Sequence, residues 1–122
     1  MGLPIRLNHK PTAWRSNQFV IPIRCWLDRA KTQPLDLSRF GPTWNSQVRL
    51  SYGDVLAATF TVTKVFNEDE VFYGIDLGLS GSITAALTEP YYVFDVEVTG
   101  GGISPLTVFL GGFQVDGDVT RP

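Results

Sequence analysis

The stretch PYYVFDVEV, residues 90–98, decides how this 122-residue chain is expected to fold. Its even positions from Tyr92 to Val98 are all apolar, whereas its odd positions include Asp95 and Glu97. Because successive side chains of a strand point to opposite faces of a sheet, this alternation predicts a strand with one buried and one solvent-facing side. Glycines at 100–102 follow the stretch and are expected to end the strand.

The same alternation recurs along most of the chain. It is found in residues 18–28, 43–52, 54–66, 71–79 and 104–118. Only SGSITAAL, residues 80–87, favours a short helical turn, which Ser80 or Ser82 would cap. Many short strands without a long helix predict an all-β, immunoglobulin-like antiparallel β-sandwich with one short helical turn. We expect an extended N-terminal arm in residues 1–17 and the sandwich domain in residues 18–122.

The phase of the alternation also assigns side chains to the core. The residues expected to point inward are Phe19, Ile21, Ile23, Cys25 and Leu27, then Trp44, Ser46, Val48 and Leu50, then Leu56, Ala58, Phe60 and Val62, and finally Val71, Tyr73, Ile75 and Leu77.

Three local features refine this expectation. Pro22 lacks a backbone donor, so its strand should lie at a sheet edge or turn that position toward solvent. The apolar phase of the last strand slips at Gly111-Gly112, which predicts a β-bulge with Leu110 and Phe113 both inward. Tyr92, or else Tyr91, is expected to form a tyrosine corner whose hydroxyl bonds back to the preceding loop.

Composition excludes several classes of protein. The formal net charge of −2 argues against a nucleic-acid binder, which usually carries a basic field. A single cysteine allows no internal disulfide. No apolar run is long enough to predict a membrane span, and the first residues lack the continuous apolar core of a secretion signal.

Candidate catalytic and metal-binding groups are few. A nucleophile pair would require His9 to meet Cys25, which is expected to point into the core. One His and one Cys are too few for a zinc site, and the acidic turns at 67–70 and 116–118 lack the calcium-loop pattern. Asp95 and Glu97 have the spacing of a glycosidase pair but are expected on a flat sheet face without a cleft. We therefore expect no enzyme activity, no cofactor and no metal.

Apolar and aromatic residues outside the expected core suggest contact surfaces instead. Trp and Arg are enriched at protein interfaces, and burying large apolar groups of an arm would favour docking on a neighbour. An arm folded back on its own domain, and Trp26 packed under a loop, are the alternatives. Phe72 and Trp26 are also candidate exposed aromatics for a glycan surface. The candidate interface residues are Leu3, Ile5, Leu7, Trp14, Arg24 and Trp26.

Four stretches resemble the small immunoglobulin-like modules of tailed-bacteriophage virions, similar to the N-terminal domain of the phage baseplate upper protein. They are PLDLSRFGPTWNSQVRLSYGDVLAATFTV, VFYGIDLGLSGSITAAL, PYYVFDVEVTGG and VFLGGFQVDGDVTR, within residues 34–121. Residues 37–43 and the N-terminal segment depart from the family's pattern.

The resemblance implies a structural subunit without catalytic residues, located in the virion after assembly in the host cytoplasm. It implies other virion proteins as partners, and a homo-oligomer or multiple copies in the particle. A tail-tip or baseplate position is expected. The alternatives are a capsid-associated decoration or head-fibre anchoring protein, or a sandwich that binds host-surface carbohydrate.

Overall fold

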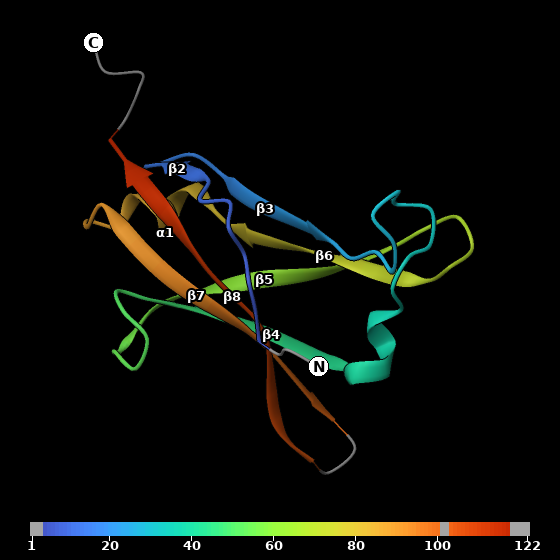
Figure 1. The fold of residues 1–122 in the computed structure, drawn as a ribbon. Helices are drawn as coiled ribbons and strands as arrows, with labels where there is room; N and C mark the ends of the chain where they lie inside the picture. Colours follow the sequence, from blue (N-terminus) through green and yellow to red (C-terminus); the bar gives the residue numbers. More distant parts are fainter. Residues whose placement is uncertain (1–3, 101–102, 118–122) are drawn as a thin grey trace.

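The computed structural model describes residues 4–100 and 103–117, which form mainly β-strands (Figure 1). Two short helical segments interrupt them: the 3₁₀ turn η1 (Leu37–Phe40) and the helix α1 (Gly81–Ala85). The strands are β1 (Ile5–Arg6), β2 (Thr12–Trp14), β3 (Phe19–Arg24), β4 (Thr43–Arg49), β5 (Leu56–Phe66), β6 (Phe72–Leu79), β7 (Tyr91–Gly100) and β8 (Ile103–Asp116).

The strands form one curled sheet that folds into two facing layers. The strand order is β1-β8-β7-β4-β5-β6-β3, and β2 also pairs with β8. The long strand β5 joins the layers, because residues 56–60 pair with β4 whereas residues 61–66 pair with β6. One layer therefore carries β4, β7 and β8 and the other carries β3 and β6, as expected for the predicted immunoglobulin-like sandwich.

Aromatic rings from both layers fill the centre of the sandwich. Phe19 on β3 lies 5.1 Å from Phe113 on β8, and Phe60 on β5 lies 5.3 Å from Phe94 on β7, measured between ring centroids. All four rings are buried, and Tyr92 stacks on Phe113 at 5.8 Å. Such ring pairs add roughly 0.5–1.5 kcal/mol each beyond their buried area, so this cluster ties the layers together without a disulfide.

The connection between β6 and β7 confirms two predictions. Ser80 caps α1, and its hydroxyl accepts a hydrogen bond from the Ile83 backbone N–H. The Glu89 backbone N–H donates to the Tyr92 hydroxyl over 3.1 Å, which forms the predicted tyrosine corner. The short helix and the corner together determine how the chain enters β7.

The edge position predicted for the Pro22 strand is also confirmed. β3 is the last strand of the order and pairs only with β6 among the described residues. The Cys25 N–H donates to the Tyr73 carbonyl over 2.8 Å. In an antiparallel pair the residues that bond to the partner strand alternate, so Ile23 and Ile21 also direct their backbone groups toward β6. Pro22 lies at the alternate phase, and its missing N–H costs the ladder no hydrogen bond.

The register of the sheet shifts at four places, and none of them lies at Gly111-Gly112. Val96 and Glu97, which are consecutive on β7, pair with Phe109 and Thr107 on β8. Val108 is therefore the extra residue of a bulge on β8. The predicted bulge position is therefore wrong, and Gly112 has no positive φ. Gly111 serves packing instead, since a Cβ there would lie 2.5 Å from the Phe94 ring.

A bulge between β5 and β6 changes which aromatic residue of β6 is buried. Val65 and Phe66 on β5 oppose Gly74 and Phe72, which leaves Tyr73 as the extra residue. Ile75 and Leu77 point inward as predicted, but beyond the bulge Phe72 is buried and Tyr73 only partly so. The predictions of an inward Tyr73 and an exposed Phe72 are wrong, because one extra residue reverses the faces of the strand.

Predicted inward residues at the strand ends are exposed. Leu27, Leu50 and Leu56 retain half or more of their side-chain exposure. β3 ends at Arg24 and β4 at Arg49, so the first two leucines lie beyond the paired ladder. Leu56 lies beyond a bulge at Ala57, which turns it to the outer face beside Arg49. The alternation continues in the sequence past the point where a facing layer covers the strand.

The N-terminal segment lies on its own sandwich rather than leaving it. β1 and β2 each pair in parallel with β8 (Figure 1). The Leu7 N–H donates to the Leu110 carbonyl over 2.8 Å, and the Arg15 Nε donates to the Leu87 carbonyl over 2.7 Å. The prediction that the arm departs from the domain is therefore wrong for the described residues 4–17. The edge of β8 that does not face β7 would otherwise carry unpaired backbone groups, and the N-terminal segment pairs with them.

Candidate functional site

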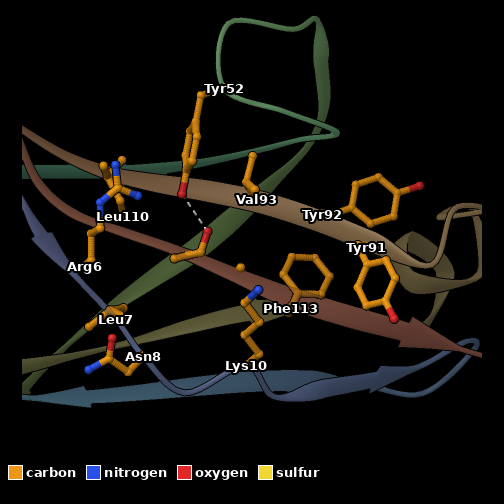
Figure 2. A pocket seen from close by; sticks show the side chains of 12 residues that line it. Arg6, Leu7, Asn8, Lys10, Tyr52, Tyr91, Tyr92, Val93, Leu110 and Phe113 are labelled. Atoms are coloured by element: carbon orange, nitrogen blue, oxygen red, sulfur yellow. Dashed lines mark hydrogen bonds between the residues drawn. The ribbon is translucent and has the colours of Figure 1, made fainter.

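A groove opens on the solvent-facing side of β7 and β8, beneath the ring of Tyr52 (Figure 2). Its volume is about 370 Å³. The N-terminal segment forms one wall with Arg6, Asn8 and Lys10, and the β4–β5 loop supplies Tyr52 opposite. Tyr91, the first residue of β7, also lines the groove. We call this the Tyr52 groove.

The Tyr52 hydroxyl anchors the loop to the sheet. It donates to the Gly111 carbonyl over 2.9 Å. Partial burial raises the pKa of Tyr52, and the Arg6 charge and the hydrogen bond oppose that rise. The nearby Asp95 charge raises the pKa further. With its pKa raised, the hydroxyl stays protonated at neutral pH.

Asp95 and Glu97 lie on the other side of Tyr52, in a second depression of about 300 Å³. The β4–β5 loop with Asp54 forms part of its wall, so the predicted flat, cleft-free face is wrong. Arg49 Nη1 lies 4.0 Å from Asp95 Oδ2, and both side chains are about one quarter exposed. Such a half-open ion pair contributes little to stability.

A third opening lies at the edge where the two layers meet. It has a volume of about 250 Å³ and is lined mainly by apolar groups of β1, β3, β8 and η1, with Phe40 and Phe109 among them. Trp26 contacts Tyr73 edge-on, with ring centroids 5.1 Å apart, and its backbone bridges to Pro34. We call this opening the edge groove.

Four of the six predicted interface residues meet in the edge groove. They are Ile5, Leu7, Arg24 and Trp26. Arg24 is not free there, because its Nη1 lies 2.9 Å from Asp76 Oδ1. Trp14 lies elsewhere, at the end of β2, and Leu3 lies outside the described residues.

The remaining candidate groups of the sequence are Cys25, His9 and the acidic turns. Cys25 is largely enclosed, and this burial raises the pKa of its thiol to about 11, against the opposing Arg24 charge. His9 is exposed between β1 and β2. In residues 4–100 and 103–117, no three His, Cys, Asp or Glu side chains are placed to hold a metal ion. Asp118 of the second acidic turn lies outside those ranges.

Sequence reasoning missed the Tyr52 groove. Gly53 and Asp54, which follow Tyr52, are typical of a turn, and a turn signal predicts a chain reversal but not where the preceding ring will lie. Arg6 and Lys10 belong to a segment without a recognisable period, so its pairing with β8 had no local signal. The groove brings together residues of the N-terminal segment, the β4–β5 loop and β7, which are far apart in the sequence.

No protein-family model matches the chain, and no curated protein is significantly similar to it. The described residues also contain no helix of the length and apolarity that crossing a membrane requires. The class of the protein is defined by its fold, an immunoglobulin-like β-sandwich with several hollows at its surface.

Proposed function

We propose that this chain is a non-enzymatic structural subunit of a tailed-phage virion, positioned at the tail tip or baseplate. The resemblance of residues 34–121 to phage modules suggests the particle. The edge groove suggests how the subunit attaches, since it gathers residues that the sequence marked for contact. In this proposal a neighbouring virion protein inserts an apolar segment between β1 and β3.

The single observation that carries the proposal is the open seam at the edge groove. β1 and β3 are the two ends of the strand order, and no described strand pairs with their outer edges. Val20 and Arg24 have the same phase as Pro22, so their backbone groups face this edge. An unpaired edge beside apolar side chains is the arrangement that accepts an added strand. Pro22 and the Arg24–Asp76 pair limit uncontrolled pairing there.

Two alternatives use the same module differently. A capsid-associated decoration or head-fibre anchor would use the edge groove in another part of the particle. A host-surface carbohydrate binder would rely on exposed aromatic residues, of which Tyr52 and Tyr91 line one groove.

The test introduces Ile5→Ser into the phage that encodes the chain, followed by mass spectrometry of purified particles. Ile5 is about half exposed, so the domain should fold with little change. We expect the wild-type chain in the particles and the variant strongly depleted, while its soluble level stays unchanged. Immunogold labelling would then separate tail tip from capsid.

Val55→Ser is the matched control, since Val55 is 83 % exposed in the β4–β5 loop and does not line the edge groove. It should be incorporated normally. Absence of the wild-type chain from purified particles would overturn the virion proposal. Equal incorporation of both variants would overturn the role of the edge groove.

A further inference from the structure

The Tyr52 groove combines two positive charges with a lining that contains no acidic side chain. Arg6 and Lys10 both line it, and Lys10 directs its ammonium group toward the groove in Figure 2. Neither forms an ion pair with any residue in 4–100 or 103–117, where the salt bridges involve Arg24 and Arg49. Two uncompensated cations on one wall favour an anionic ligand, and a guanidinium can bind a carboxylate or phosphate in bidentate fashion.

The opposite side of the groove offers exposed aromatic surface over a low floor. Tyr91 is 62 % exposed and Tyr52 is about half exposed. Val93 and Gly112 are partners in the β7–β8 register and form part of the floor, and Gly112 has no side chain to fill the space. Tyrosine presents an apolar ring together with a polar hydroxyl, which suits a ligand that is both flat-faced and hydroxylated.

From this combination we propose that the Tyr52 groove binds a saccharide that carries a negative charge. The acidic group pairs with Arg6 and Lys10, a ring face packs on Tyr91 or Tyr52, and Asn8 contributes hydrogen bonds to hydroxyls. A deep apolar pocket is not required, because sugars retain most of their hydration. A uronic acid and a sugar phosphate meet this description equally well.

Both walls of the groove are held in place before any ligand arrives. The Gln114 N–H donates to the Pro11 carbonyl over 2.9 Å, and the Leu7 N–H bonds to Leu110, so residues 8–10 are held at both ends. Across the groove the loop is held by the Tyr52 hydrogen bond and by Arg49 Nε, which donates to the Asp54 carbonyl over 2.8 Å. Such preorganisation lowers the entropy lost on binding.

This site is separate from the assembly role proposed above. The Tyr52 groove and the edge groove lie on the two sides of β1 and share only Leu7. Loss of glycan binding would therefore leave particle incorporation intact, and loss of incorporation would leave glycan binding intact.

The experiment applies the full-length protein to an array of uronic-acid, sialic-acid, phosphorylated and neutral glycans, with Kd measured by calorimetry for those bound. We expect binding to acidic glycans only, whether carboxylate or phosphate. The double variant Arg6→Gln with Lys10→Gln should weaken it by about tenfold or more, as expected for lost charge-assisted hydrogen bonds. Tyr91→Ala should weaken binding while leaving the melting temperature unchanged, because its ring is mostly in water.

The matched control is Arg29→Gln with Lys31→Gln, which removes the same charge from the β3–β4 connection away from the groove. It should bind as the wild type does. Binding to no acidic glycan, equal loss in the two double variants, or equally strong binding of inorganic phosphate or an oligoglutamate peptide would each overturn the proposal.

Discussion

Replacing Tyr92 by Phe tests the tyrosine corner with a single-atom change. The Phe ring keeps the stacking on Phe113, and only the hydroxyl that accepts from the Glu89 N–H is lost. A neutral hydrogen bond contributes about 0.5–1.5 kcal/mol net, and exposed Glu89 allows water to satisfy the released N–H. We therefore expect the free energy of unfolding to fall by about 1 kcal/mol, which lowers the melting temperature by about 2–5 °C for a domain of this size.

The measurement is urea denaturation followed by tryptophan fluorescence, with Tyr91→Phe as the matched control. Tyr91 precedes Tyr92 in the sequence but is exposed, and its hydroxyl makes no hydrogen bond within the described part of the chain. Its variant should unfold as the wild type does. If the two variants have the same unfolding midpoint, the corner does not stabilise the fold and the reasoning is wrong.

Three further outcomes are expected. Gly111→Ala should lower stability by about 1–3 kcal/mol, because its Cβ would meet a buried ring at 2.5 Å, whereas Gly78→Ala, whose nearest neighbour is at 3.9 Å, should change the melting temperature little. The Cys25 thiol, with a pKa of about 11, should react with a thiol reagent at a rate that still rises above pH 9. The thiol of the unfolded chain ionises at a lower pH than the buried thiol, so rising pH stabilises the unfolded state. The free energy of unfolding should therefore fall between pH 9 and about pH 11, and the Cys25→Ser variant should lack this fall. Asp95→Asn with Glu97→Gln should change stability by less than about 1 kcal/mol, and a glycosidase activity abolished in this double variant would contradict the non-enzymatic proposal.

The two-residue alternation was sufficient to predict most of the strands. Segments such as 54–66 and 90–98 match β5 and β7 closely, because a strand buried on one side must repeat its apolar residues with a period of two. Ser80, Pro22 and Tyr92 were also predictable, since each acts through its own backbone or a neighbour a few residues away.

Bulges and strand ends were not predictable from the pattern. Val108 and Tyr73 are extra residues only with respect to the strands opposite them, so their position depends on the register between distant segments. Leu50 has the periodicity of a core residue, yet no element of the facing layer reaches it. Burial is a property of the packed layers, whereas periodicity is a property of one strand.

The sequence by itself determined the fold class and the edge strand. Only the tertiary structure decided which residues the N-terminal segment lies beside. Parallel pairing with β8 placed Arg6 and Lys10 opposite Tyr52 and brought Ile5 to the seam near Trp26. The physical reason is that backbone hydrogen bonds with β8 hold the N-terminal segment. Every residue type except proline can form these bonds, so they leave no recognisable pattern of side chains in the sequence.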